Sequence, residues 1–483
     1  MKDLKKILSI PVFISVTLAL CSCKTEKDIS YIEWYIPRPT ANMSNQGAVE
    51  EAANRIIYDK IGAKLRFQFV KNFDEKMNIL ISTGEPFDIC LTCGWQNKFI
   101  PNVKRGAFLP LNDLLSKYGK DILKQEEDFA WKTASVDGKI YAIPGQNIWS
   151  PIISCSVRKD FAEKYGLDIG SVKNIKDLEP FFEKIKENEP NIIPLGGDIS
   201  SMISDRRYYS TDIEGLIFTK DTQTFMCELD APQMLENLRT IHKFYEKGYI
   251  DRNAASKKNI QSEINEGRYA VFPGVTVVDD GGAKTSATVG YDVLPIIFGQ
   301  ESITNASVQT AMTAISKTSP NPEKSMQLIN LVWQDKELLN LLAYGIEGSD
   351  YTVVSGAGTD DISVLPNSGV SVRYGVAHNW LGPLFNQWDS PWNSKESLMK
   401  IRKQNEIGEV SPLLGFIINT DGMETELSRV SSILNSANVI LKLGSMEDFD
   451  KFIGDIRAKL DDAGMNKIIQ EVTRQYNEWK SGN

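Results

Sequence analysis

The hydrophobic pattern of the first hundred residues alternates between the periods of strands and helices. Strands are expected over residues 31–36, 65–69 and 87–91, and helices over residues 49–57 and 74–82. The second strand gives the plainest signal, because the apolar residues Leu65, Phe67 and Phe69 alternate with charged or amide side chains. Strands joined by helices at this spacing predict parallel βαβ units and a sheet covered by helices.

The same alternation continues along the chain until a long aromatic segment interrupts it. Further strands are expected over 139–144, 152–157, 269–272 and 291–298, and helices over 160–166, 177–187, 235–245, 449–460, 468–479 and from 322 onward. Residues 348–414 differ, because Trp380, Trp388 and Trp392 lie there among Gly, Pro, Asn and Ser with little periodicity. Long irregular segments in compact domains are usually functional or disordered, and disordered segments contain few tryptophans. We therefore expect an ordered, loop-rich wall.

The N-terminus has the features of a lipoprotein signal. Lysines precede the apolar residues 7–20, a stretch that matches a signal-peptide core in length and is too short to span a bilayer comfortably. It ends in the sequence LCSC at residues 20–23, which resembles a bacterial lipobox. Cys23 fits the lipidated position because a small serine precedes it, whereas Cys21 follows a bulky leucine. A signal peptide over 1–22 and a lipid anchor on Cys23 are expected; a plain signal peptide with incidental cysteines is the alternative.

Composition narrows the possible chemistry. The formal net charge is −9, so a general nucleic-acid partner, which would need a basic face, is not expected. Only His242 and His378 are available, too few for a multi-histidine metal site or a histidine-based catalytic triad, and no metal or cofactor is expected. Cys90 and Cys93 form a CxxC motif, but no second pair or nearby histidine completes a zinc site. Burial in a strand explains Cys90 better, and a disulfide between the two remains open.

Four motifs, in order along the chain, resemble one protein family. They are GEPFDI at 84–89, GAFLPL at 106–111 with Phe108 in place of the usual leucine, GKIYAIP at 138–144, and ISKTSPNPEK at 315–324, after which Ser325 replaces the usual alanine. Together they resemble the extracellular solute-binding proteins of ABC importers, in the sugar-binding group that includes maltose-binding protein. Residues 344–351 and the tail from 415 to 469 further resemble the LipO-like lipoproteins, which carry an additional C-terminal domain and are usually linked to carbohydrate uptake.

The resemblance implies an α/β, two-lobed, periplasmic-binding-protein-like fold of class II. Each lobe would be built from two chain segments, with a ligand cleft between them and crossovers near Pro144, Gln300 and Gly345. The expected division is 1–22 for the signal peptide, 23–145 with 301–345 for lobe 1, and 146–300 with 346–483 for lobe 2, where 415–483 forms a helical region specific to the subgroup.

A sugar site needs aromatic planes for the C–H faces of the ring and polar side chains for the hydroxyl rim. Residues of both kinds occur at strand ends, after the first crossover and in the tryptophan-rich wall. The candidate ligand-binding residues are Trp95, Gln96, Asn97, Gln146, Asn147, Trp149, Tyr208, Phe272, Trp380, Trp388 and Trp392. No catalytic residue is expected.

The sequence thus predicts a monomeric binding protein and not an enzyme. Its expected role is to capture a carbohydrate, an oligosaccharide, by hinge closure and to deliver it to ABC permease subunits, while a lipid holds it on the outer side of the cell membrane. Two alternatives remain. A secreted glycoside hydrolase would need two carboxyl groups about 5–9 Å apart across the sugar. A surface polysaccharide-binding lipoprotein would show helical repeats or a flat aromatic platform.

Overall fold

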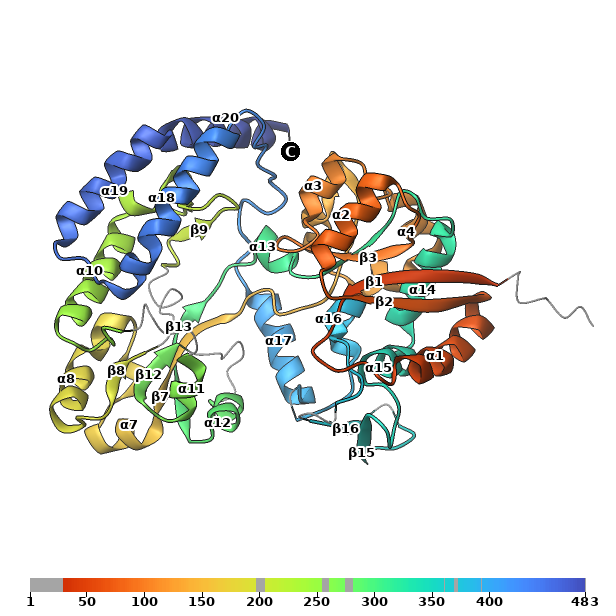
Figure 1. Ribbon diagram of the computed structural model, residues 1–483, viewed down its shortest axis with the longest axis horizontal. Coiled ribbons are helices and arrows are strands. Elements are labelled where there is room, and N and C mark those ends of the chain that lie inside the picture. Colours follow the sequence, from red (N-terminus) through yellow and green to blue (C-terminus); the bar gives the residue numbers. More distant parts are fainter. Residues whose placement is uncertain are drawn as a thin grey trace, which may run out of the picture.

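A computed structural model describes residues 29–196, 205–253, 260–273, 281–359, 361–368, 372–391 and 393–482. The predicted signal peptide, the anchor Cys23 and the candidate Trp392 lie outside these ranges. Within them, no helix is both long enough and apolar enough to cross a membrane. The described chain folds into two lobes that stand side by side, with α13 (Asn305–Val308) and α17 (Lys395–Ile407) between them (Figure 1).

The first lobe is built on a five-stranded sheet. Its order is β2 (Ala63–Val70), β1 (Ser30–Pro37), β3 (Ile89–Thr92), β14 (Met312–Ile315) and β6 (Ile143–Pro144). The first three strands run parallel, as their βαβ spacing predicts, whereas β14 pairs antiparallel with both β3 and β6. Because β14 comes from a segment far along the chain, the lobe is discontinuous in sequence.

Helices and short strands complete this lobe. They are α1 (Gln46–Ile61), α2 (Phe73–Thr83), α3 (Phe99–Lys104), α4 (Asn112–Tyr118), α5 (Lys120–Gln125), α6 (Asp128–Thr133), β4 (Ser135–Val136), β5 (Lys139–Ile140), α14 (Pro322–Gln334) and α15 (Lys336–Tyr344). The face of α1 that carries Val49, Ala53 and Ile57 is fully buried against the sheet, at the spacing the sequence predicts.

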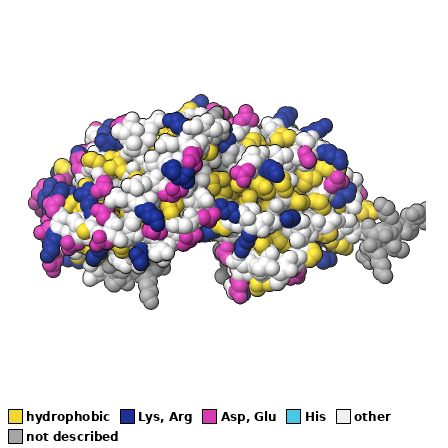
Figure 2. All heavy atoms as spheres, turned by 90° about the horizontal axis from the view of Figure 1, so that it is seen from above, with side chains coloured by type: hydrophobic (Ala, Val, Ile, Leu, Met, Phe, Trp, Pro, Cys, Tyr) yellow, Lys and Arg dark blue, Asp and Glu magenta, His cyan; other side chains and the backbone are white. Residues whose placement is uncertain are grey.

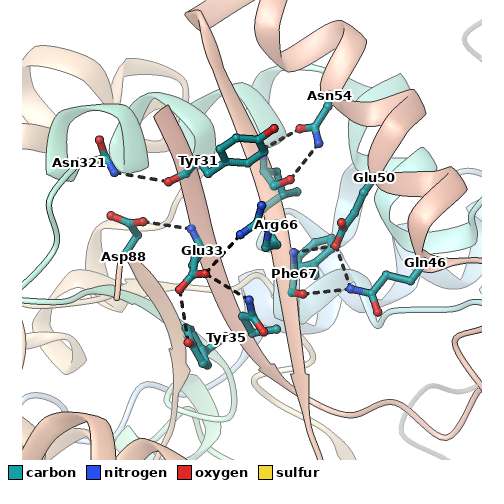
Figure 3. A network of polar contacts seen from close by, with 12 residues as sticks. Tyr31, Glu33, Tyr35, Gln46, Glu50, Asn54, Arg66, Phe67, Asp88 and Asn321 are labelled. Atoms are coloured by element: carbon teal, nitrogen blue, oxygen red, sulfur yellow. Dashed lines mark hydrogen bonds and ion pairs between the residues drawn. The ribbon is translucent and has the colours of Figure 1, made fainter. Parts of the chain in front are cut away.

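Side-chain bonds fasten the return segment to the first strand (Figure 3). Asp88, buried just before β3, accepts the Glu33 backbone N–H at 3.0 Å and the Ser319 hydroxyl at 2.5 Å. Asn321 Nδ2 donates to the carbonyl of Tyr31 at 3.4 Å. The carboxylate therefore joins three segments that are distant in sequence, which is a structural role for Asp88.

The second lobe has two small sheets. One has the order β13 (Val293–Gln300), β7 (Ile152–Arg158), β12 (Tyr269–Pro273) and β8 (Ile193–Leu195), and the other has the order β11 (Phe225–Cys227), β10 (Leu216–Thr219) and β9 (Tyr208–Ser210). The helices from the same part of the chain are α7 (Lys159–Tyr165), α8 (Glu179–Asn188), α10 (Pro232–Glu246), α11 (Ile260–Asn265) and α12 (Ala283–Val289).

Three C-terminal helices join this lobe from the end of the chain. They are α18 (Glu424–Leu443), α19 (Phe449–Ala463) and α20 (Met465–Gly482), and Figure 1 shows them arching over α10 and β9. Leu434, Ile453 and Ile468 are almost fully buried in the same core as Phe218 and Phe244 of the lobe. The second lobe is therefore also assembled from two separate segments.

Three crossover segments run side by side between the lobes. Ile303 pairs in parallel with Val410, and the Ile303 N–H donates to the carbonyl of Glu409 at 2.7 Å. A Cβ on Gly408 would lie 2.7 Å from Ser150 Oγ and 3.1 Å from Ile303 Cδ1. Glycine at 408 therefore allows the segments after β6, after β13 and after α17 to pack in contact.

The prediction that residues 346–414 belong to lobe 2 is wrong for much of this segment. It contains β15 (Tyr351–Ser355), β16 (Ser363–Pro366) and α16 (His378–Leu381). Tyr374, Val376 and Leu381 are buried in the core of the first lobe, and the Val376 N–H donates to the carbonyl of Ala343 at 2.9 Å. The third crossover consequently lies near Gly408 and not near residue 345.

Candidate functional site

A cavity of about 480 Å³ opens where the crossover segments meet the second lobe. It is lined by Ile148 and Pro151 of the first crossover, by Glu301, Ser302, Thr304, Ala306, Ser307 and Thr310 of the second, and by Ile153, Asp205, Arg206, Tyr208, Tyr209, Ser210, Ile217, Glu228 and Met234 of the second lobe. We call it the hinge cavity. It combines apolar and aromatic surface with a few polar groups, as ligand sites commonly do.

A second cavity of about 400 Å³ adjoins the first on the side of the second lobe. The two share Ile153, Asp205 and Arg206. Its other lining residues are Lys173, Asn174, Ile175, Lys176, Arg207, Gln233, Glu236, Asn237 and Phe298, most of them polar or charged. We call it the distal cavity. The junction of the two therefore lies at the start of the loop that leads into β9.

Ion pairs neutralise several charges of the distal cavity. Arg207 pairs with Asp205 at 2.8 Å, and Lys176 pairs with Glu236 at 2.9 Å. Arg206 differs from its neighbour, because its guanidinium has no hydrogen bond or ion pair to another described residue. The junction thus presents a cation whose donors are not engaged by the described part of the chain.

A carboxylate from the third crossover fixes the edge of the hinge cavity. Glu409 accepts the Tyr209 hydroxyl at 2.6 Å and the Ser302 hydroxyl at 3.2 Å, and it also accepts a hydrogen bond from Lys220. Burial alone would raise the pKa of Glu409, but the hydrogen bonds from Lys220 and Tyr209 outweigh it and lower that pKa. These bonds connect the second lobe to two crossovers.

Trp95 reaches toward this cavity from the first lobe. It lies in the loop after β3, as predicted, with 59% of its side chain exposed. Its indole Nε1 donates to the carbonyl of Thr310 at 3.1 Å, and Thr310 lines the hinge cavity. Seen from the top of Figure 1, hydrophobic side chains gather on the half that the first lobe forms (Figure 2). The indole is thus held beside the cavity while much of its ring remains accessible.

The first crossover is more structural than the sequence suggests. Trp149 is 1% exposed and packs edge-to-face on Phe129 with centroids 5.3 Å apart, so the structure buries this ring in the core and does not expose it to the cavity as the prediction requires. Gln146 is also buried. Its Nε2 donates to the carbonyl of Gln125, and its Oε1 accepts the N–H of Phe385. Only Asn147 remains partly accessible, where its Nδ2 donates to Thr310 Oγ1 at 2.8 Å.

Two other candidates are also core residues. Phe272 is 1% exposed within a cluster that includes Tyr269 and Val293, so the structure places it in the core and not at an accessible strand end. Asn97 is 5% exposed, and its amide bonds the carbonyl of Leu91 and accepts from Asn102. The loop itself therefore uses the polar atoms that were predicted to contact ligand.

The remaining candidates are half-buried. Tyr208 lines the hinge cavity, whereas Gln96 lies beside Trp95 and its carbonyl accepts the Cys93 N–H at 3.1 Å. Trp380 packs against both core clusters of the first lobe. Trp388 stacks on Tyr344 with centroids 6.4 Å apart. Neither of these two tryptophans lines the two cavities, and they belong to the first lobe, so their expected place on a second-lobe wall is wrong.

The thiols and histidines are buried in the core. Cys90, Cys93, Cys155 and Cys227 are all free and buried, and burial raises the pKa of Cys93 to about 11. His242 and His378 are 9% and 7% exposed in different lobes. Among the described residues, no group of three or more His, Cys, Asp or Glu side chains is placed to hold a metal ion.

Arg206, Glu228, Glu301 and Ser302 line the hinge cavity but were not among the candidates. The sequence position of two of them could have identified them as candidates, because Glu301 and Ser302 directly follow the crossover expected near Gln300. No comparable signal identified Glu228, which reaches the cavity only through the fold of the second lobe.

Comparison with known families identifies two matches along the chain. The model of the bacterial extracellular solute-binding proteins matches residues 40–337. A domain family of unknown function, DUF3502, matches residues 412–481, which include the three C-terminal helices. A carbohydrate ABC transporter substrate-binding protein of Streptococcus pneumoniae serotype 4 is 30% identical over 443 residues, which are 88% of this chain and 87% of that protein. Lipoprotein LipO of Bacillus subtilis is 21% identical over 321 residues, 60% of this chain and 61% of LipO.

Solved structures show the same overall arrangement. The N-glycan transport solute-binding protein NgtS of Streptococcus pneumoniae is 28% identical and superposes with a TM-score of 0.81 over 93% of this chain and 98% of NgtS. The NgtS complex with Man1GlcNAc gives a TM-score of 0.71 over 93% and 99% of the two chains. The complex with Man5GlcNAc gives 0.68 over 94% and 99%. This chain therefore matches the NgtS structure described without a glycan better than these two glycan complexes.

Proposed function

Because the chain belongs to the family of bacterial extracellular solute-binding proteins, we propose that it captures an oligosaccharide between its two lobes and delivers it to an ABC permease. Support for a carbohydrate ligand comes from the 30% identical substrate-binding protein of Streptococcus pneumoniae and from the glycan complexes of NgtS. The two-lobed fold is that of NgtS, so the proposal needs only that this chain uses its cleft for the same class of ligand.

The position of the hinge cavity is the main support for this function. Crossover residues form one wall of it and the second lobe forms another, so a bound ligand would contact the segments about which the lobes move. Ligand contacts that exist only when the lobes are closed stabilise the closed state, which is how hinge closure couples to binding. The lower TM-scores against the NgtS glycan complexes support an open arrangement here.

Three accessible residues would contact the sugar. Trp95 would supply a stacking plane from the first lobe, since its exposed ring is held at Thr310 on the edge of the hinge cavity. Tyr208 would supply a second aromatic face from the opposite lobe. The Asn147 amide donates one N–H to Thr310 Oγ1 and accepts the Ile148 N–H, and its second N–H would bind a hydroxyl group. Together they combine apolar planes and polar groups as carbohydrate recognition requires.

The domain division follows from the packing of the two cores. We place residues 23–145 and 301–407 in lobe 1, and residues 146–300 and 412–483 in lobe 2. Burial of Tyr374 and Leu381 in the first core and of Leu434 and Ile468 in the second supports this division.

A lipid anchor would hold the protein next to its permease. Removal of residues 1–22 would leave Cys23 at the N-terminus for acylation, and two or more acyl chains give stable membrane attachment. The described fold begins only a few residues later, at Ser30, so the tether would be short. LipO, which is 21% identical, is named a lipoprotein and supports this location on the outer side of the membrane.

Binding without turnover distinguishes this role from that of a glycoside hydrolase. Titration calorimetry of residues 24–483 with neutral oligosaccharides, followed by chromatography of the recovered sugar, tests both. We expect saturable binding and an intact oligosaccharide after prolonged incubation. Shortened products would establish a hydrolase instead, and absence of binding across a broad glycan panel would contradict the proposal.

A further inference from the structure

The hinge and distal cavities adjoin each other at Arg206. Both cavities are lined by Ile153, Asp205 and Arg206, so these three side chains mark the boundary at which the cavities meet. Each volume lies in the lower half of the usual range for small-ligand sites, about 300–1,000 Å³, and the two together reach its upper end. A ligand that fills only the hinge cavity would leave the junction and the distal cavity unoccupied.

A close backbone approach positions the Arg206 guanidinium. Gly299 has a φ of +151°, and a Cβ built on it would lie 2.6 Å from Arg206 Cζ and Nη1. The guanidinium therefore lies against the backbone of β13, in space that any other residue at 299 would occupy. Its carboxylate neighbour Asp205 is already bonded to Arg207. The planar donors of Arg206 remain available for a pair of oxygen atoms on a ligand.

Two carboxylates of the hinge cavity have no cation partner in the described part of the chain. Glu228 approaches from the second lobe and Glu301 from the second crossover, and neither forms a hydrogen bond or ion pair from its carboxylate to another described residue. Burial raises the pKa of both groups, with Glu214 adding to the effect at Glu228. Their surroundings already disfavour negative charge, so a negatively charged ligand at this position would be disfavoured further.

We infer that the site selects a neutral oligosaccharide long enough to cross from the hinge cavity to the distal cavity, with Arg206 binding its hydroxyl oxygens at the junction and Glu228 and Glu301 excluding acidic sugars. This inference rests on the proposed function and adds to it the charge and the minimum length of the ligand. The distal cavity is rich in amide and charged side chains, which suits hydroxyl groups.

The first experiment measures affinity against length and charge. Residues 24–483 are titrated with neutral manno-, malto-, xylo- and cello-oligosaccharides of two to six units, with Man1GlcNAc and Man5GlcNAc, and with oligogalacturonates of equal lengths. We expect one neutral series to bind with an affinity that rises steeply with length, and the acidic series to bind at least roughly tenfold more weakly. If no sugar of any kind binds, the proposed function itself fails. If the acidic series binds best, or if length has no effect, the function stands and this inference is overturned.

Variants then test the residues. Arg206→Ala should weaken binding of the longest neutral ligand by roughly tenfold to one-hundredfold, as expected for hydrogen bonds to a charged group, and affect the disaccharide by less than about threefold. Arg55→Ala is the matched control, because Arg55 is an exposed arginine on α1 of the first lobe. Equal losses for long and short ligands, or no loss for the long one, would contradict the junction role.

The carboxylates and the glycine give two independent tests. The double variant Glu228→Gln with Glu301→Gln should raise affinity for the acidic series relative to the neutral one, and an unchanged ratio would refute the exclusion. Gly299→Ala should weaken long-ligand binding in the native background but add little to Arg206→Ala, because both disturb the same guanidinium. Additive losses in a variant that retains its melting temperature would show that Gly299 does not act through Arg206.

Discussion

Replacing Trp95 with alanine tests whether this side chain contacts ligand or stabilises the core. The side chain is 59% exposed, so about two fifths of it is already in contact with protein. Full burial of a large apolar side chain is worth about 1.5–3 kcal/mol, and a ligand that covers the exposed three fifths would gain about 1–2 kcal/mol from it. Trp95→Ala should therefore weaken oligosaccharide binding by roughly five- to thirtyfold.

The same variant should leave the free protein nearly as stable as before. No cavity forms in the core when an exposed ring is removed, and the single lost hydrogen bond to Thr310 is worth only about 0.5–1.5 kcal/mol. Calorimetric titration measures the affinity, and thermal unfolding without ligand measures the stability. Trp95→Phe retains a ring face without the N–H donor and should recover most of the affinity.

Phe272→Ala is the matched contrast. This ring is 1% exposed, so its loss should destabilise the second lobe by about 3–5 kcal/mol. Binding measured well below the lowered melting temperature should change little, because the ring does not reach the hinge cavity. If Trp95→Ala instead lowers the melting temperature strongly and leaves affinity unchanged, the reasoning that places Trp95 at the ligand is refuted.

Three further predictions concern the anchor, the thiols and the hinge. Cys23→Ala should abolish labelling by a fatty-acid analogue and release the protein into the medium, whereas Cys21→Ala should not; continued labelling of the Cys23 variant would exclude this residue as the anchor. In the folded protein from residue 24 onward, a thiol reagent at pH 8 should label almost no cysteine, because all four thiols are buried and burial raises the pKa of Cys93 to about 11. Four thiols should react after denaturation, and only two reactive thiols would indicate a disulfide. Because hydrogen bonds lower the pKa of Glu409 in the folded state, its stabilisation is present above the usual carboxyl value of 4.5 and is lost as pH falls through the folded value. Glu409→Gln should therefore lower the melting temperature more near pH 7 than near pH 3, and an equal difference at both pH values would refute this.

The strand and helix periods predicted most of the regular structure. The strands expected over 31–36 and 65–69 are β1 and β2. Apolar and polar residues alternate along β2, whereas β1 lies between β2 and β3 and is recognised by its aromatic and β-branched residues. The helix α18 was missed. Its buried face includes the small Ala437, and its exposed face carries Val439, which is 51% exposed, so the apolar period is blurred.

The site was harder to predict than the fold, because exposure of an aromatic residue depends on distant contacts. Trp149 follows a crossover just as a ligand contact would, but Phe129 and Ile303 enclose it. Conversely, Arg206 faces the cavities because the distant Gly299 leaves room for it. Neither relation can be read from local sequence.

An inter-lobe distance measurement tests the central claim that an oligosaccharide closes the lobes about the hinge. Spin labels on Glu51→Cys in α1 and Glu163→Cys in α7 lie on exposed positions of opposite lobes, and the four native thiols are buried. Pulsed electron–electron double resonance measures the distance between the two labels. With a saturating oligosaccharide identified by calorimetry, the distribution of this distance should shift to a shorter, narrower peak. An unchanged distribution at a ligand concentration that calorimetry shows to be saturating would contradict hinge closure.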